Sequence, residues 1–568
     1  MKIKILTLQF ALCLITNAQS PNWQWAKSAG GFPAPGGNHF GNSISTDANG
    51  NCYATGNFQV PNIVFGNDTL TSPTTNGTMM YVVKYDSSGN VQWANRPGGV
   101  GIITLGNGIA TDANGNSYVT GGFSGTVIFG STTLVGNGFC LVKYDNTGNV
   151  LWAKGTNGSS TNTQGKRVSI DANGNVYVTG TFSDPTITFG SYTLYNAYSS
   201  NPINIFAVKY DSVGNVLWAK SAGSNNAVGN KDVYTMGIST DANGNCYVTG
   251  YFHYIITIGA ITLTGSSTGG DCVFIVKYDN AGNVVWAKGS DGTYPSSGTA
   301  TGISADAIGN SYILGNFISP VFYIGTDTLT DAFGGSTLFI VKYDSAGNFR
   351  WAKQTTTAGN SNIETQGIST DAKGNSYTTG RFFGVVSFSN QTIFSNGNND
   401  IFVAKYDSAG NALWAKGVGA PPQNAGGVGI ALNTKGNCFV TGSFESPSMV
   451  FDGDTVFNTD MWGGSDNVFV AKLNSSDIAG VQEENNLLNE IIIYPNPTNG
   501  KIEVRSEKLE IRGLDIYNVL GKKMYSSNSS QTTGSRQQAI DISSLPCGIY
   551  FLQIKTPIGV AVRKIVKE

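Results

Sequence analysis

Histidines and glutamates, two of the side chains most often used for acid–base catalysis, are scarce in this sequence. Its two histidines, His39 and His253, lie in unlike stretches, so neither a serine–histidine–aspartate arrangement nor a zinc site is predicted. Between residues 22 and 476 the only glutamates are Glu364 and Glu445. A glycosidase with paired carboxylates would therefore depend on aspartates.

Most aspartates recur along the chain, which indicates a structural role, whereas Asp271 and Asp466 stand outside the recurring blocks and could still act. The segment Asp47-Ala48-Asn49-Gly50-Asn51 has oxygen-bearing residues at alternate positions, as at the start of a calcium loop, but it lacks the distal glutamate. Its Asn-Gly pair is typical of a hairpin turn, so calcium stays an unsupported alternative. We predict that the protein has no catalytic residue, no metal ligand and no cofactor, and that it is not an enzyme.

Three short blocks recur seven times and define the organisation of the chain. The first, Asp-Ala-x-Gly-Asn, begins at Asp47, Asp112, Asp171, Asp241, Asp306 and Asp371, with a degenerate copy at Asn433. The second, Lys-Tyr-Asp, begins at Lys84, Lys143, Lys209, Lys277, Lys342 and Lys405, with a variant at Lys472. The third, Trp-Ala-Lys or a variant, begins at Trp25, Trp93, Trp152, Trp218, Trp286, Trp351 and Trp414.

Each repeat predicts four strands, for example 237–240, 245–250, 273–278 and 284–288. Asn-Gly and Gly-Asn turns join the first strand to the second and the third to the fourth. The third strand is apolar on both faces, as expected where a sheet is packed between two neighbours. The predicted fold class is all-β, and four-stranded units repeated radially form a β-propeller.

The order of the blocks predicts a closed ring. The chain begins with an isolated fourth strand at Trp25 and ends its repeats with an isolated third strand near Lys472. The two ends would complete one blade together, which gives a seven-bladed propeller without open edges. One tryptophan per blade at a fixed position predicts packing between blades rather than a sugar-stacking array.

In longer form the first block is Asp-Ala-x-Gly-Asn-x-Tyr-Val-Thr-Gly, and the second and third together are Val-Lys-Tyr-Asp-x-x-Gly-Asn-Val-x-Trp-Ala-Lys. A further repeated motif, Phe-Gly-x-x-Thr-Leu, stands in an insert between the second and third strands and predicts a small hairpin. Together these patterns resemble the SBBP family of bacterial β-propeller repeats. The resemblance covers residues 22–476. It implies the propeller fold and export, and it brings no known catalytic residue with it.

The two ends of the chain have other compositions. Residues 1–18 carry Lys2 and Lys4, an apolar run and small residues, as a cleaved signal peptide does. Residues 477–490 are typical of a linker, and 491–568 contain seven short strand-like runs that predict a small Ig-like β-sandwich. No later apolar run is long enough to predict a transmembrane segment.

Three segments of 491–568, namely Tyr494-Pro495-Asn496-Pro497, 514–521 and 548–552, resemble the type A sorting domain of the type IX (Por) secretion system. The resemblance implies passage through the periplasm and the outer membrane, with this domain recognised by the secretion machinery and its sortase. Removal of the domain and attachment to the cell surface, or release, would follow. The expected localisation is extracellular or on the cell surface.

The predicted function is a binding or adhesion module for a glycan or a protein, because unlike residues gather on the face that carries the second-to-third and fourth-to-first connections. The alternative is a secreted polysaccharide hydrolase or lyase with its site in the propeller channel. With 12% charged residues and a net charge of −2, nucleic acid is not an expected partner. The candidate binding residues are His39, Phe40, His253, Tyr254, Asp271, Arg381 and Trp462.

Overall fold

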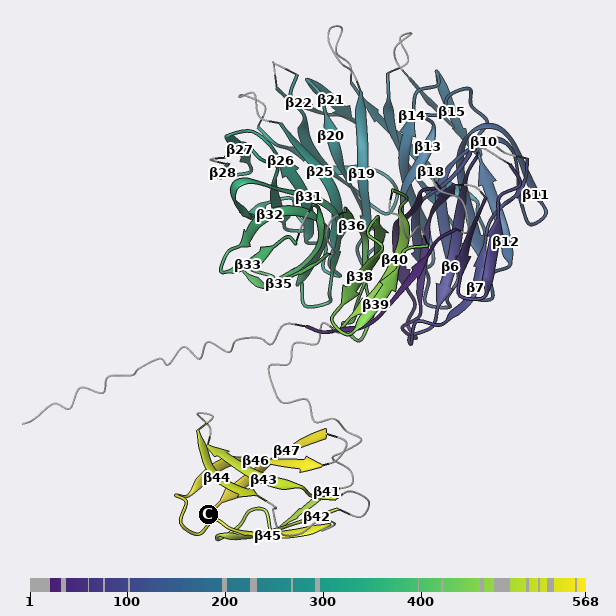
Figure 1. Cartoon of the computed structure of the whole chain (residues 1–568). Helices are drawn as coiled ribbons and strands as arrows, with labels where there is room; N and C mark the ends of the chain where they lie inside the picture. Colours follow the sequence, from purple (N-terminus) through teal and green to yellow (C-terminus); the bar gives the residue numbers. More distant parts are fainter. Residues whose placement is uncertain are drawn as a thin grey trace, which may run out of the picture. The chain divides into compact units, whose positions relative to one another are not determined.

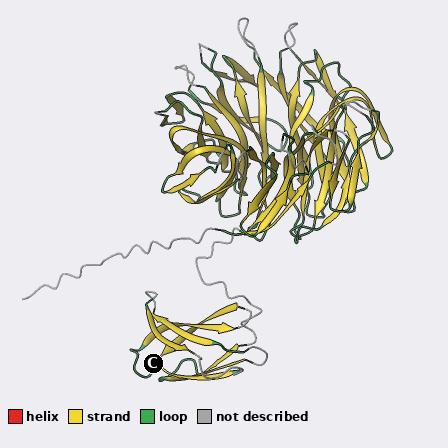
Figure 2. Ribbon diagram, in the orientation of Figure 1, coloured by secondary structure: helices red, strands yellow, loops and turns green. Residues whose placement is uncertain are grey.

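The computed structural model describes residues 21–31, 37–59, 61–74, 77–100, 103–196, 202–224, 232–266, 269–291, 297–331, 333–396, 398–419, 423–459, 464–474, 491–506, 510–518, 522–528, 536–556 and 559–568. Contacts divide the chain into a compact unit spanning Ser20–Ser476 and a second one that includes Asp477–Glu568. The described residues form strands and loops throughout, and none of them is helical (Figure 2). Accordingly, the described part of the chain contains no helix suited to crossing a membrane.

In the first unit one pattern of four antiparallel strands is repeated seven times (Figure 1). The first strands are β2 (His39–Thr46), β9 (Ile103–Thr111), β13 (Gln164–Ile170), β19 (Val233–Thr240), β25 (Gly298–Ala305), β31 (Thr356–Thr370) and β36 (Ala425–Leu432). The second strands are β3 (Cys52–Gln59), β10 (Ser117–Phe129), β14 (Val176–Phe182), β20 (Cys246–Phe252), β26 (Ser311–Phe317), β32 (Ser376–Phe388) and β37 (Cys438–Phe444). We number the repeats 1 to 7 in this order.

The third strands are buried along most of their length. They are β6 (Thr78–Tyr85), β11 (Thr132–Tyr144), β17 (Asn204–Tyr210), β23 (Cys272–Tyr278), β29 (Thr337–Tyr343), β34 (Asp400–Tyr406) and β40 (Asn467–Leu473). The fourth strands of repeats 1 to 6 are β7 (Val91–Asn95), β12 (Val150–Gly155), β18 (Val216–Gly223), β24 (Val284–Gly289), β30 (Phe349–Gln354) and β35 (Ala412–Val418). Gly98–Gly99, β8, adds a short pairing to β10.

The fourth strand of repeat 7 comes from the other end of the unit. Strand β1 (Trp23–Ala29) pairs with β40 in antiparallel register, with Trp25 opposite Lys472 and Ala29 opposite Val468. The side chains of Trp23 and Trp25 are both buried there. Because Lys472 Nζ also donates to the Ser87 carbonyl, repeat 7 contacts repeat 1 directly.

The Asp-Ala-x-Gly-Asn blocks form the turns between first and second strands. Asp47 Oδ1 accepts the backbone N–H groups of Asn49 and Asn51 at 2.9 and 3.0 Å, and Oδ2 accepts from the Asn51 amide at 2.7 Å. Gly50 has a φ of 85°, a value that favours glycine. The carboxylate is therefore the acceptor that closes a turn.

Aromatic and lysine side chains join neighbouring repeats. Trp25 Nε1 donates to the Ser87 carbonyl at 3.1 Å, and Trp93 Nε1 donates to the Asn146 carbonyl at 3.1 Å. The same bond from the tryptophan of one repeat to the turn of the next recurs at Trp152, Trp218, Trp286 and Trp351. The block lysines lie over second-strand rings, as Lys84 does over Tyr53 at 5.3 Å from the ring centroid. Packing between repeats, which the register of the tryptophans predicts, is confirmed.

A small hairpin follows the second strand. It is formed by β4 (Asn62–Phe65) with β5 (Asp68–Thr71), β15 (Thr186–Phe189) with β16 (Tyr192–Tyr195), β21 (Ile255–Ile258) with β22 (Ile261–Thr264), β27 (Val321–Ile324) with β28 (Asp327–Thr330), and β38 (Ser448–Phe451) with β39 (Asp454–Phe457). In repeats 2 and 6 the long strands β10 and β32 supply it, the latter with β33 (Gln391–Phe394). Asp454 Oδ2 accepts the Ala26 N–H at 3.1 Å, so this hairpin contacts the outer strand of its repeat.

The second unit has two sheets around one apolar core. One sheet has the order β41-β42-β45, with β41 (Ile491–Tyr494), β42 (Lys501–Ser506) and β45 (Gln537–Asp541). The other has the order β44-β43-β46-β47, with β43 (Gly513–Asn518), β44 (Lys523–Asn528), β46 (Gly548–Thr556) and β47 (Gly559–Lys567). Side chains of both sheets, among them Val504, Ile516 and Leu552, meet in the core.

Candidate functional site

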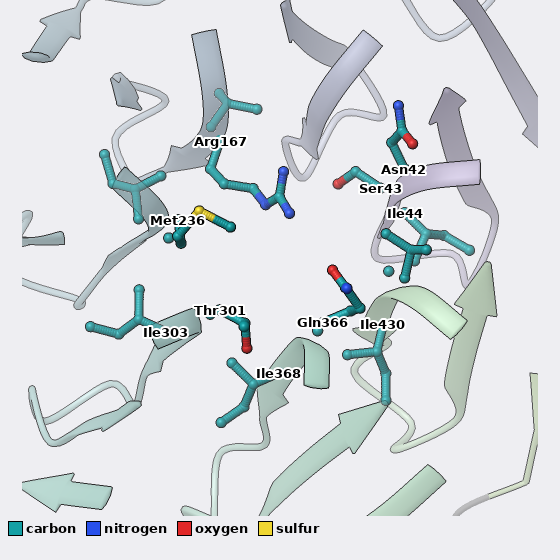
Figure 3. A pocket seen from close by; sticks show the side chains of 17 residues that line it. Asn42, Ser43, Ile44, Arg167, Met236, Thr301, Ile303, Gln366, Ile368 and Ile430 are labelled. Carbon is teal, nitrogen blue, oxygen red and sulfur yellow. The ribbon is translucent and has the colours of Figure 1, made fainter. Parts of the chain in front are cut away.

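A cavity of about 120 Å³ lies between the first strands of six of the seven repeats (Figure 3). Three layers of side chains line it. One layer is apolar and includes Ile44, Ile238 and Ile303, and the middle layer is glycine at four of its six positions. The third layer is made by residues at which each first strand bulges.

The bulge occurs at the same position in all seven first strands. The pairing skips one residue there, which gives the set Asn42, Asn107, Lys166, Met236, Thr301, Gln366 and Val428. Five of these seven line the cavity, the exceptions being Asn107 and Lys166. A β-bulge turns a side chain away from the ordinary alternation of a strand and recurs next to binding sites.

The repeated Thr-Gly of the second strand makes room for this bulge. A Cβ atom on Gly56 would lie 1.8 Å from the carbonyl oxygen of Phe40, and one on Gly250 would lie 1.9 Å from that of Tyr234. Because only glycine permits so close an approach, the second strand can stay paired across the bulge of the first.

The middle layer holds one long side chain. Where other repeats have glycine or Ser43, repeat 3 has Arg167, and its guanidinium points into the cavity (Figure 3). Arg167 Nη1 donates to the carbonyls of Asn107 and Lys166, both at 3.0 Å. Burial lowers the pKa of Arg167, and burial together with the Arg167 charge lowers the pKa of Lys166 to about 8.

On each first strand, the residue two positions before the bulge pairs with a residue of the second strand. These cross-strand pairs differ in every repeat. They are Phe40 with Asn57, Leu105 with Gly122, Gln164 with Thr181, Tyr234 with Tyr251, Thr299 with Asn316, Glu364 with Arg381, and Gly426 with Ser443. We call these seven pairs the rim. A single backbone position thus presents apolar, aromatic, amide and charged groups on a rigid scaffold.

Repeat 4 gathers aromatic and titratable groups at the rim. The rings of Tyr234 and Tyr251 stack with centroids 5.0 Å apart, and the Tyr251 and His253 centroids are 6.3 Å apart. His253 Nδ1 lies 3.2 Å from Asp271 Oδ1. Burial raises the pKa of Asp271, which the His253 charge opposes, and burial with Asp271 raises the pKa of Tyr251 to about 12. Two sequence-predicted residues, His253 and Asp271, come together here, and a third, Tyr254, follows His253 in the chain with a φ of 58°.

Repeats 6 and 1 hold two further predicted residues. The Arg381 guanidinium donates to Glu364 Oε2 through Nε at 2.9 Å and Nη2 at 2.6 Å, and both side chains are partly exposed. Phe40 is half-buried, and its carbonyl accepts from the Tyr81 hydroxyl at 3.1 Å. Both are rim residues. They belong to strands, whereas the sequence placed them among loop residues.

The structure places one further predicted residue, His39, away from the rim. His39 is buried at the start of β2, where its Nε2 accepts the Gly31 N–H at 3.0 Å, so the side chain supports the strand end. Trp462 lies outside the described residues.

His39 predicts a dependence of stability on pH. Burial lowers its pKa from 6.5 to about 4, so the folded chain keeps the imidazole neutral where the unfolded chain takes up a proton. The neutral, buried imidazole therefore contributes to the free energy of unfolding above about pH 6.5, and this contribution is lost as the pH falls toward about 4. The change amounts to about 3 kcal/mol. Denaturant unfolding of wild type and His39→Gln at about pH 7 and about pH 4.5 measures it. Equal acid destabilisation of both proteins would contradict the assignment.

Sequence reasoning missed the bulge residues, among them Lys166, and the neighbouring Arg167. Two signals pointed to them. The glycine of the repeated Thr-Gly stands inside a strand, which suggests a bulge or a close backbone approach. The sequences of the first strands also differ from repeat to repeat just before the similar residues that end each strand. For example, Gly165-Lys166-Arg167 in repeat 3 stands where repeat 1 has Gly41-Asn42-Ser43. In the part of the chain that the structure describes, no three histidine, cysteine or acidic side chains are grouped as metal ligands would be.

Comparison with known families agrees with the repeats and with the second unit. Residues 151–181 match the SBBP family, described as a beta-propeller repeat, and residues 492–568 match the Por_Secre_tail family, described as a secretion system C-terminal sorting domain. The chain carries a β-propeller repeat and a secretion sorting domain. The sorting domain marks the propeller protein for secretion by the type IX system, to the cell surface or the extracellular space.

One curated relative is an uncharacterised WD repeat-containing protein of Acanthamoeba polyphaga mimivirus, 25% identical over 308 residues. The match covers 43% of this chain, and the chain spans only 22% of that relative's length.

Similar solved structures include a PL25 ulvan lyase bound to -[GlcA(1-4)Rha3S]-, at 12% identity and a TM-score of 0.38, covering 71% of this chain and 91% of that one. Regucalcin of Agrobacterium tumefaciens, a calcium-binding protein, has 11% identity and a TM-score of 0.27, with coverage of 60% and 81%. A Synechocystis apocarotenoid oxygenase mutant has 9% identity and a TM-score of 0.36, with coverage of 78% and 94%. At these TM-scores none of the three bears on the activity of this chain.

Proposed function

We propose that this chain is a secreted seven-bladed β-propeller that binds a glycan where the rim surrounds the entrance to the cavity. In this proposal the seven repeats are the blades, and repeat 7 closes the ring with β1 as its outer strand. The second unit is an Ig-like sandwich that the type IX machinery and its sortase recognise. The mature protein then acts as an adhesion module at the cell surface.

The observation that carries the proposal is the contrast between the two ends of the first strands. At one end, Asp-Ala-x-Gly-Asn turns of nearly constant sequence satisfy their own hydrogen bonds. At the other end, seven equivalent positions hold seven different side-chain pairs. Recognition requires unlike groups held in fixed positions, and of these two ends, as far as the structure describes them, the rim is the one that supplies such groups.

A glycan fits the groups at the rim better than a protein does. The stacked Tyr234 and Tyr251 are both only partly buried, and aromatic faces pack against sugar rings while phenol groups bond to hydroxyls. The planar Arg381–Glu364 pair adds donors and acceptors at the same level. No large apolar surface, as in the centre of most protein interfaces, is needed for this recognition.

The rim predicts a loss of glycan affinity in Tyr251→Thr. Threonine stands at the equivalent position of repeat 3, as Thr181, so the strand accepts this residue. With the stacking partner gone, we expect the dissociation constant for a glycan selected on an array to rise about tenfold. The matched control is Asn243→Lys at the turn end of the same repeat, since Lys373 occupies that position in repeat 6. Unchanged affinity in Tyr251→Thr, or equal loss in the control, would remove the rim from the proposal.

A second candidate function is cleavage of a polysaccharide, and the His253–Asp271 pair favours it. A carboxylate 3.2 Å from Nδ1 orients an imidazole for general acid–base chemistry, and no described residue bonds to the His253 Nε2. If the chain cleaves its glycan, His253→Asn abolishes product formation and preserves binding. Binding without any product in the wild type would eliminate this candidate.

A further inference from the structure

We infer that the cavity between the first strands binds an oxyanion through Arg167, with the adjacent Lys166 adding positive charge from just outside the lining, and that the anion is the charged group of an acidic glycan. The inference deepens the proposed function and rests on it, because it names the class of glycan that the rim would hold. Carboxylate, sulfate ester and phosphate groups share the chemistry that a guanidinium recognises.

The position of Arg167 indicates a binding role. In the other repeats its place is taken by Ser43, Gly108, Gly237, Gly302, Gly367 and Gly429, and all of these except Gly108 line the cavity beside it. The long side chain therefore occupies a layer that is otherwise nearly empty of side chains. Packing between repeats does not require it, because the repeated architecture is made with glycine at this position.

The charge of Arg167 is not neutralised by the described residues. Both of its hydrogen bonds come from Nη1 and go to backbone carbonyls, and neither Arg167 nor Lys166 forms an ion pair with a described residue. The one carboxylate among the seven rim pairs, that of Glu364, is bonded to Arg381. Both side chains are partly buried, and two adjacent cations that have lost part of their hydration are stabilised by an accompanying anion.

The rest of the cavity can complete an oxyanion site. Gln366 points into it from the wall opposite Arg167 and bonds to no described residue (Figure 3). Ser43 Oγ accepts the Ile109 N–H at 3.3 Å, which leaves its hydroxyl hydrogen for a ligand. A volume of about 120 Å³ admits one charged group with some water, but not a polymer chain. The sugar chain would therefore lie on the rim while its acidic group enters the cavity.

The test uses the full secreted chain with sodium sulfate, glucuronic acid and a sulfated disaccharide as probes in titration calorimetry. Arg167→Gly introduces the residue that most other repeats have at this position, and Lys166→Met introduces the residue of repeat 4. Both variants are therefore expected to fold. We expect at least about a tenfold loss of sulfate affinity in Arg167→Gly and a smaller loss in Lys166→Met. Because the pKa of Lys166 is about 8, affinity should also fall as the pH rises above that value.

The matched control is Lys373→Asn, which removes an exposed positive charge from the turn end, where repeats 1 to 4 have asparagine. Equal loss in this control, or unchanged sulfate binding in Arg167→Gly, would overturn the inference. Tighter binding of the sulfated disaccharide than of sulfate supports the glycan source, whereas equal affinity would assign the cavity to a free ion and overturn that part. Glycan binding that depends on Tyr251 but not on Arg167 would overturn the inference and leave the proposed function standing.

Discussion

Deletion of residues 22–29 is expected to lower the free energy of unfolding of the propeller unit by at least about 5 kcal/mol. The segment includes strand β1, in which Trp23, Trp25, Ala26 and Ala29 are buried. The Trp23 ring packs edge-on against Phe451 with centroids 4.9 Å apart. Its removal also leaves β40 unpaired on one side, and an open strand edge invites association with other chains.

Denaturant unfolding of the full secreted chain measures this effect, and two controls sharpen it. Lys27→Ala changes an exposed side chain of the same strand and should shift stability by less than about 0.5 kcal/mol. A synthetic peptide of residues 20–31, added to the deleted protein, should restore most of the lost stability by filling the vacant position. An unchanged melting temperature after deletion would show that the two ends of the unit do not depend on each other.

Truncation after Ser476 is expected to abolish delivery to the cell surface without unfolding the propeller unit. The apolar clusters of this unit are made by residues between Trp23 and Leu473, whereas the core of the second unit is made by residues between Ile502 and Ile565. Each unit therefore keeps its own core after separation. Only the second unit matches a sorting domain, so its loss removes the export signal.

Fractionation of a native host that secretes by the type IX system tests this prediction. The truncated chain should be folded, protease-resistant and confined to the periplasm, and fusion of residues 477–568 to an unrelated periplasmic protein should bring that protein to the surface. Appearance of the truncated chain in the medium or on the surface would contradict the role of the second unit.

The strands and turns could be predicted because the sequence pattern that indicates them occurs in all seven repeats. The predicted strands 237–240, 245–250, 273–278 and 284–288 correspond to β19, β20, β23 and β24, and the short insert forms a hairpin. The order of the blocks predicts that the strand of Trp25 pairs with the strand of Lys472, and β1 does pair with β40. Local turn chemistry and hydrophobic pattern fix these features, and both are visible in the sequence.

The candidate site could be predicted only in part, because it depends on tertiary position. Tyr251 and Tyr234 look like ordinary strand residues, and only the register across β19 and β20 shows that they form a pair at the rim. His39 has the sequence context of an exposed loop residue, yet the fold buries it against Gly31. Lys166 and Arg167 were missed because a bulge changes which side chains face the channel, and periodicity assumes an unbroken strand.

The lysines of the Lys-Tyr-Asp blocks are further residues whose role depends on tertiary position. At a strand end they look like solvated surface residues, but they lie over second-strand rings and donate to the turn of the next repeat, as Lys277 does to the Ser345 carbonyl at 2.9 Å. Burial lowers the pKa of Lys84 and Lys143. The structure thus assigns the block lysines to joining the repeats and leaves the rim as the variable surface.

A crystal structure of the chain in complex with the glycan selected on the array tests the central claim most directly. The account predicts sugar density over the rim, in contact with Tyr234 and Tyr251 and with residues of at least one further repeat, and with an acidic group directed toward Arg167. Density confined to the Asp-Ala-x-Gly-Asn turns or to the outer hairpins, with the rim and the cavity empty, would contradict it.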